Sequence, residues 1–438
     1  MFTFLETAAL LLGLSALFGW LNHKFLPFPH AVGLLIMSVV SSGVLIAVDR
    51  AIPGQHLFEA LTAPLGAIDF SRIVMDGMLA FLVFAGALHV NFGRLRDRAW
   101  QVGVLAVVGT VLSTAIIGFA VWWLAPLFGW PLTLGWSLVF GALISPTDPV
   151  AVLSILRTVA LPPSIEVELQ GEALFNDGVG IVLVAALTAY AAGQGEQHGG
   201  LVGSGVLLVT EAGGGLLLGL VTGLVAYWGM RMIDDYPVEV LISLALVTGT
   251  YAIALRIGVS GPLAMAAAGL LIGTRGPRDA MSDRTQTYLF GLWTLIDEIL
   301  NSVLFLLIGL EVLVISTGSI SLGFAAAAIP IVVVARLVAV FCPLVIAPLG
   351  VAMSLRNVPF LTWAGVRGGI SVALALALPA SEAKPLILSA TYAVVLFSIV
   401  VQGLTLPVVA RLTGVAAPDG GKAGGSAPSG ARALDAET

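Results

Sequence analysis

The chain has 438 residues, of which 58% are hydrophobic and 10% are charged, and its formal net charge is −6. A soluble domain carries about 25% charged residues, so this composition excludes an ordinary soluble protein and indicates an integral membrane protein. The apolar runs are about 20 residues long and lack alternation, which predicts transmembrane helices and excludes a β-barrel. The single cysteine, Cys342, excludes a disulfide framework and a cysteine metal site.

The apolar runs predict an all-α fold with thirteen membrane-spanning helices. Their predicted ranges are 3–21, 27–48, 72–90, 100–125, 133–155, 169–192, 202–229, 237–255, 259–273, 288–314, 321–348, 357–379 and 386–411. The first run carries Glu6 and lacks a basic start, so we expect a first span rather than a cleaved signal peptide. The tail at 413–438 is rich in Gly, Ala, Ser and Pro, and it is predicted to be disordered.

Basic residues between the predicted spans orient them, because cytoplasmic loops carry an excess of Lys and Arg. One side would collect Lys24, Arg94, Arg96, Arg98, Arg157, Arg231, Arg275, Arg278, Arg284, Arg356, Arg411, Lys422 and Arg432. The other side would collect Arg50, Arg72, Arg256 and Lys384. The asymmetry places the N-terminus outside and the C-terminus in the cytoplasm of a multi-pass protein of the cell inner (plasma) membrane.

Two predicted spans are interrupted. The fifth contains Ser145-Pro146-Thr147-Asp148-Pro149, and its prolines would free the carbonyls of Ala142 and Ser145 near mid-membrane. The twelfth contains Trp363–Ser371, with three glycines and Arg367. Each is the second span of a group of three, and the groups are seven spans apart, so they insert in opposite directions. Paired interruptions of this kind point to a secondary transporter with inverted repeats.

The sixth predicted span begins with two acids and an amide, Glu172, Asn176 and Asp177. Charged groups at membrane depth are costly, so they are paired or functional. Glu172 and Asp177 lie about 140° apart around a helix, so they need different partners. We assign Glu172 to Arg336 of the eleventh span as a structural ion pair. In the alternative, Arg336 extends to the membrane surface.

Asp177 is then left without a dedicated cation, which is what a site for an exchangeable cation requires. Burial favours the protonated carboxyl and a bound cation favours the carboxylate, so the proton and the cation compete. Because its neighbour Asn176 is uncharged, the pair holds one negative charge at most. The residues therefore predict electroneutral exchange of one monovalent cation for one proton.

The interrupted spans offer three further candidate residues, Asp148, Arg367 and Thr147. Asp148 and Arg367 would offset the partial charges at the broken helix ends. In the alternative, Asp148 is a second ligand of the transported ion. Thr147 supplies a hydroxyl and a carbonyl, and with Asp177 it forms the predicted site for transported Na⁺.

Other polar residues leave their roles open. Asp297 and Glu298, followed by Asn301, either line the cavity or pair locally. Glu211 is expected near the outer end of the seventh span. His89 is either a pH sensor or, as we expect, an ordinary interfacial histidine.

Several motifs together resemble the bacterial NhaP-type sodium/proton antiporters, which are related to the eukaryotic sodium/proton exchangers. The resemblance extends from about Leu26 to Arg411. The motifs are Phe84-Ala85-Gly86-Ala87-Leu88-His89, Ser145-Pro146-Thr147-Asp148-Pro149, Gly171-Glu172-Ala173-Leu174-Phe175-Asn176-Asp177-Gly178, Ala335-Arg336 and Val366-Arg367-Gly368-Gly369.

The resemblance implies an NhaA-like antiporter fold within residues 1–412. Core (transport) helices would lie at about 100–192 and 321–411, and dimerisation (scaffold) helices at about 1–90 and 202–314. It also implies a homodimer in a lipid bilayer and an elevator-like alternation of the core. By motif, Asp177 matches the ion- and proton-binding aspartate, Asn176 its neighbour and Thr147 a backbone ligand. Glu172 and Arg336 match the interhelical ion pair.

Two positions depart from the ligand set of some members. Ala173 replaces a serine, and Ala85 replaces a glutamate. The cation could therefore be Na⁺, Li⁺ or K⁺, and a K⁺/proton antiporter is an alternative. A secondary transporter of an organic solute is a weaker one, because the residues supply a compact acidic point. An enzyme is disfavoured, since no His lies near a catalytic or metal-like spacing. A channel is a third alternative, against which a saturable flux with strict counter-transport of protons would argue. We expect no cofactor, no catalytic residue and no nucleic-acid partner.

Overall fold

The structure, a computed structural model, describes residues 4–26, 28–51, 70–130, 132–148, 152, 161–193, 200–315, 322–346 and 355–415. These ranges contain helices and connecting turns but no strand. Most of the tail predicted at 413–438, and with it Lys422 and Arg432, lies outside the described residues, as do Arg157 and Pro149.

The described residues form a series of helices along the chain. The α-helices are α1 (Phe4–Phe25), α2 (His30–Ala51), α4 (Phe70–Arg72), α5 (Leu79–His89), α6 (Phe92–Asp97), α7 (Ala99–Gly103), α8 (Thr110–Leu124), α9 (Leu134–Ile144), α11 (Pro163–Ala191), α12 (Gly200–Arg231), α13 (Tyr236–Ile257), α14 (Gly261–Arg275), α15 (Asp283–Ile315), α16 (Leu322–Ile346), α17 (Val358–Trp363), α18 (Gly369–Ala377), α19 (Lys384–Leu396) and α20 (Gly403–Leu412). Short π-helical segments, η1 (Ile73–Met78), η2 (Val104–Gly109), η5 (Gly276–Ala280) and η7 (Phe397–Gln402), and the 3₁₀ segments η3 (Ala125–Phe128) and η6 (Leu355–Asn357) extend or join them.

Ten helical stretches of the described chain are long and apolar enough to cross a membrane. The three remaining predicted spans fall on shorter helices, namely α9, α14 and the pair α17 and α18. The all-helical membrane architecture is therefore shown. The count of thirteen spans remains a prediction, since length and composition alone do not decide whether a short helix crosses.

Helix ends differ from the predicted spans where the terminal turns are polar. α11 begins at Pro163 rather than at 169, and α15 begins at Asp283 rather than at 288. The predicted ranges followed hydrophobicity, whereas a helix persists as long as its backbone hydrogen bonds do. Proline at the first helical position suits the start of α11, because its missing amide hydrogen has no helical partner there.

The structure shows both interruptions. α9 ends at Ile144, and residues 145–148 are not helical. α17 ends at Trp363, and α18 begins at Gly369 after an irregular segment. Pro146 in the first segment removes a backbone donor, and the glycines in the second weaken the helix there.

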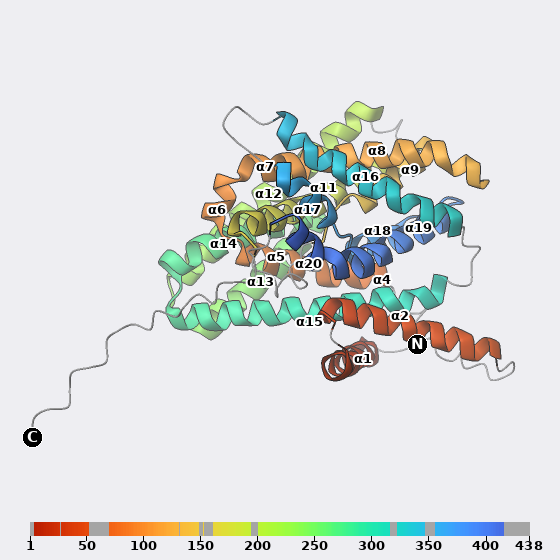
Figure 1. The fold of residues 1–438 in the computed structure, drawn as a ribbon. Coiled ribbons are helices and arrows are strands. Elements are labelled where there is room, and N and C mark those ends of the chain that lie inside the picture. Colours follow the sequence, from red (N-terminus) through yellow and green to blue (C-terminus); the bar gives the residue numbers. More distant parts are fainter. Residues whose placement is uncertain are drawn as a thin grey trace, which may run out of the picture.

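The helices are arranged around the interrupted segments. α15 lies beside α2 and α1 along one edge, and α16 runs beside α8 at the opposite edge (Figure 1). α11, α17 and α18 lie between these edges (Figure 1). Close packing depends on small residues: a Cβ on Gly141 of α9 would lie 2.4 Å from the Thr114 carbonyl oxygen of α8. The interrupted segments are thus held inside the bundle.

Candidate functional site

One face of α11 carries a row of buried polar side chains. Glu168, Glu172 and Asn176 are four residues apart and share this face, and Asp177 lies on the neighbouring face. All four are buried. Gly180 allows α11 to approach the interruption after α9, because a Cβ there would lie 2.3 Å from a ring carbon of Pro146. The row therefore faces the irregular backbone.

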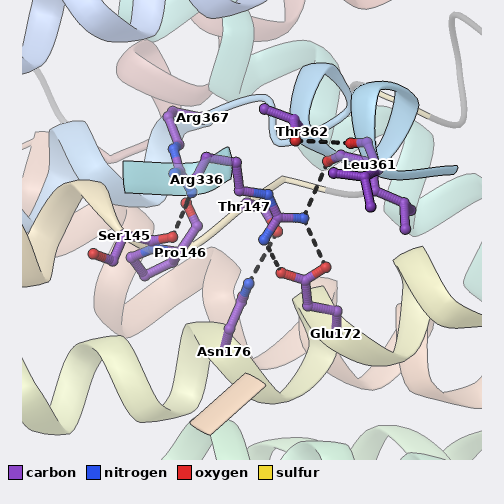
Figure 2. A network of polar contacts seen from close by, with 10 residues as sticks. Ser145, Pro146, Thr147, Glu172, Asn176, Arg336, Leu361, Thr362 and Arg367 are labelled. Atoms are coloured by element: carbon purple, nitrogen blue, oxygen red, sulfur yellow. Dashed lines mark hydrogen bonds and ion pairs between the residues drawn. The ribbon is translucent and has the colours of Figure 1, made fainter. Parts of the chain in front are cut away.

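Glu172 forms a two-point ion pair with Arg336 of α16 (Figure 2). Arg336 Nη2 donates to Glu172 Oε2 at 2.8 Å, and Nη1 donates to Oε1. Arg336 Nη2 also donates to the Leu361 carbonyl oxygen of α17 at 3.4 Å. Both side chains are almost wholly buried, which does not match an arginine extended to the membrane surface. The pair links α11, α16 and α17.

The two interruptions meet at Arg367 and Asp148. Arg367 is completely buried, and its Nη1 donates to the carbonyl oxygens of Ser145 and Pro146, the latter at 3.0 Å (Figure 2). The Asp148 amide donates to the Val366 carbonyl oxygen at 2.8 Å. The Asp148 carboxylate packs against Gly368, where a Cβ would lie 2.1 Å from Oδ2. A cation thus sits at the carboxyl end of α9 and an anion at the amino end of α18, each opposite the local partial charge.

Asn176 holds Thr147 against α11. Its Nδ2 donates to the Thr147 hydroxyl oxygen at 2.9 Å, and both residues are buried (Figure 2). Asn176 Oδ1 is buried without a hydrogen-bond partner among the described residues. This hydrogen bond links the non-helical segment 145–148 to α11, the helix that carries Asp177.

Asp177 faces a cavity of about 220 Å³. The walls of this cavity include Gln170, Ala173 and Asp177 of α11, Thr147 and Asp148 after α9, Gly368, Gly369 and Ser371 at the start of α18, His89 and Gly86 of α5, and Asp297, Asn301 and Leu304 of α15. Asp177 is 8% exposed, and no residue in the described part of the chain forms a hydrogen bond or ion pair with its carboxylate. Asp177 therefore differs from Glu172, whose carboxylate is paired with Arg336.

The other candidates divide between the cavity and elsewhere. Ala173 lines the cavity, whereas Ala85 is fully buried and lies outside its walls. His89 and Asp297 line it, while Glu298 and Glu211 do not. No three His, Cys, Asp or Glu side chains converge as a metal site in the described ranges.

The predictions from sequence missed Glu168, which precedes the predicted start of the sixth span. It is 2% exposed, and its Oε1 has no hydrogen-bond partner among the residues described. The sequence pattern could have identified Glu168, because it lies four residues before Glu172 and so shares its helix face. The Ser145 hydroxyl was also not considered, although it donates to the Gly141 carbonyl oxygen at 2.6 Å and accepts from Thr114.

Comparison with known proteins decides the family. The model of the family described as "Sodium/hydrogen exchanger, transmembrane" matches residues 13–412. The chain belongs to the sodium/hydrogen exchanger family. Among relatives of this exchanger, the Na⁺/H⁺ antiporter NhaP of Pseudomonas aeruginosa is 41% identical over 93% of this chain and 97% of its own length. The Na⁺/H⁺ antiporter NhaH of Halobacillus dabanensis is 34% identical over 89% of this chain and 93% of its own length.

A solved structure supports the fold of this family member. The sodium proton antiporter MjNhaP1 of Methanocaldococcus jannaschii matches with a TM-score of 0.71 over 93% of this chain and 97% of that chain, at 20% identity. At this identity the match shows the fold alone. The resemblance to NhaP-type proteins is confirmed, and the family consists of membrane transporters rather than enzymes.

Proposed function

We propose that this protein is an electroneutral antiporter that exchanges Na⁺ for a proton across the membrane by alternating access. Asp177 would bind the cation and the proton in turn. The relatives named above are Na⁺/H⁺ antiporters, and they share 41% and 34% of their aligned residues with this chain. That similarity supports the same pair of substrates here.

The observation that carries the proposal is the contrast between Asp177 and Glu172. Glu172 is neutralised by Arg336, whereas Asp177 meets a cavity and has no ion-pair partner among the described residues. A carboxylate in such a position is stabilised either by a proton or by a cation from solution. Since one negative charge accepts one positive charge, the two substrates exclude each other.

Hard oxygen ligands for a small cation are available around Asp177. Thr147 and Asp148 line the same cavity from the interrupted segment. We propose that Thr147 contributes an oxygen and that Asn176 holds it in place through their hydrogen bond. Asp148 and Arg367 would offset the partial charges of the broken helix ends rather than move with the ion.

We further propose two bodies that move relative to each other. Core helices within about 100–192 and 321–411 would carry Asp177 past scaffold helices within about 1–90 and 202–314. The cavity supports this division, because it is lined by α11 and α18 from the first set of helices and by α5 and α15 from the second. Inverted repeats and an NhaA-like arrangement belong to the same proposal.

The exchanger is proposed to act as a homodimer in the inner membrane, with its N-terminus outside and its C-terminal tail in the cytoplasm. The distribution of basic residues supports this orientation. K⁺ is the second candidate for the cation, supported by one observation, namely that Ala173 lines the cavity without a side-chain oxygen. Fewer protein ligands favour a cation that is held more loosely.

Purified protein in proteoliposomes tests the proposal. A preformed pH gradient should collapse when Na⁺ is added, and parallel additions of Li⁺, K⁺ and choline rank the cations. The rate should not respond to an imposed membrane potential, because one cation is exchanged for one proton. A gradient that collapses with an organic solute alone, or a rate that follows the potential, would contradict electroneutral cation exchange.

A further inference from the structure

The cavity is lined by a third acid besides Asp177 and Asp148. Asp297 and Asn301 of α15 line the same cavity as Asp177, which belongs to a different helix. They lie one helical turn apart, so they share a face of α15. A cation in this cavity is therefore surrounded by acidic residues that come from both α11 and α15.

Asn301 fixes the position of Asp297. Its Nδ2 donates to Asp297 Oδ1 at 3.0 Å and to the Asp297 carbonyl oxygen at 2.8 Å. Asn301 is 6% exposed, so its amide is held inside the protein. With Nδ2 engaged, the amide oxygen of Asn301 accepts no hydrogen bond from a described residue. The pair thus offers carboxylate and amide oxygens, which are the ligand types that hard cations prefer.

The next residue along α15 provides an internal contrast. Glu298 carries the same charge as Asp297 but is exposed and does not line the cavity. Neighbouring residues of a helix point about 100° apart, which explains the difference. The two residues carry the same charge, so it is their position around α15 that decides which of them lines the cavity.

We propose that Asp297, held by Asn301, is an entry subsite that concentrates the monovalent cation in the cavity before it reaches Asp177. This inference rests on the proposed function and adds a specific residue to it. A cavity lined by one sign of charge raises the local concentration of the opposite ion. The cavity is large enough for several water molecules, so the cation can stay partly hydrated at Asp297.

The subsite acts before the exchange step, so it affects apparent affinity and not turnover. Removing one charge at a distance of several ångströms in a wet cavity lowers the local cation concentration about three- to tenfold. Salt screens such an effect, since the Debye length falls from ~30 Å at ~0.01 M to below ~8 Å above ~0.15 M. These two signatures distinguish an entry subsite from a structural role.

The experiment compares Asp297→Asn, Glu298→Gln and Asp297→Glu in proteoliposomes, with Na⁺ as the probe. At low ionic strength, Asp297→Asn should raise the apparent KM for Na⁺ about three- to tenfold at an unchanged maximal rate. Added N-methylglucamine chloride should shrink this difference. Glu298→Gln and Asp297→Glu should retain the wild-type KM.

Several results would overturn the subsite. These are an unchanged KM in Asp297→Asn, an equal rise in Glu298→Gln, a rise that salt does not screen, or a loss of maximal rate that Asp297→Glu does not restore. The wild-type protein separates the two hypotheses. If it shows no cation-dependent proton flux, the proposed function fails; if it is active and Asp297→Asn matches it, only the subsite fails.

Discussion

The guanidinium of Arg336 on α16 contacts both carboxylate oxygens of Glu172 on α11, one with each terminal nitrogen. Both side chains are buried, and the same arginine reaches a carbonyl oxygen of α17. The two-point geometry fixes the relative rotation of these helices, which a single contact would not do. Glu172 of α11 is thereby neutralised, while Asp177 of the same helix lines the cavity.

Removing one partner of this ion pair should leave the other charge buried and unpaired, and so should destabilise the protein. Glu172→Ala leaves a buried arginine without its carboxylate, which costs about 3–5 kcal/mol. The melting temperature in detergent should therefore fall markedly for Glu172→Ala and for Arg336→Ala. The double variant should lose less than the sum of the two single variants, because neither charge is then left alone. Wild-type melting of both single variants would contradict a structural role for the pair.

Asp177→Asn should abolish cation-dependent proton flux without unfolding the protein. Asparagine has nearly the same shape but neither binds a proton nor carries a negative charge, so both substrates lose their site. The measurement is pH-gradient collapse in proteoliposomes, with melting temperature as the folding control. Asn176→Asp is the matched variant: it adds a second carboxylate beside the first, so its flux should become sensitive to membrane potential. Substantial exchange by Asp177→Asn would exclude Asp177 as the shared site.

Protons and cations should compete if they share Asp177. Lowering the pH on the cation side protonates more carboxylates, so the apparent KM for Na⁺ should rise by up to tenfold per pH unit, with an unchanged rate at saturating Na⁺. Raising the pH should lower KM until a plateau, where the carboxylate is fully ionised. Initial rates across a Na⁺ series at several pH values measure this. If the maximal rate at saturating Na⁺ decreased as the pH was lowered, the proton and Na⁺ would bind at separate sites.

Gly141→Ala should disturb the packing of α8 against α9. The added Cβ would lie 2.4 Å from the Thr114 carbonyl oxygen, which is backbone and cannot rotate away. Overpacking of this kind costs about 1–3 kcal/mol. Gly103→Ala is the matched control, since a Cβ there meets no atom within 4 Å. Melting in detergent should separate the two variants, and equal melting temperatures would show that α8 and α9 move apart at little cost.

Much of the architecture followed from hydrophobicity and from proline and glycine. Runs of apolar residues predicted a helical membrane protein, because an unpaired backbone amide in lipid is too costly. Ser145–Pro149 and Trp363–Ser371 predicted interruptions by the same reasoning, since proline removes a donor and glycine weakens the helix. Helix ends were less predictable, and α11 is longer than its apolar stretch by the turn that carries Glu168.

The sequence by itself determined which side chains are costly in a membrane: Glu172, Asp177, Arg336 and Arg367. It also ordered the two acids around α11, because the helical repeat sets their angle. Tertiary structure alone decided that Asp297 lines the cavity and Glu298 does not, and that Arg367 meets the carbonyl oxygens of Ser145 and Pro146. The reason is that helix periodicity fixes directions within one helix, whereas the rotation of one helix against another depends on the packing of the whole bundle.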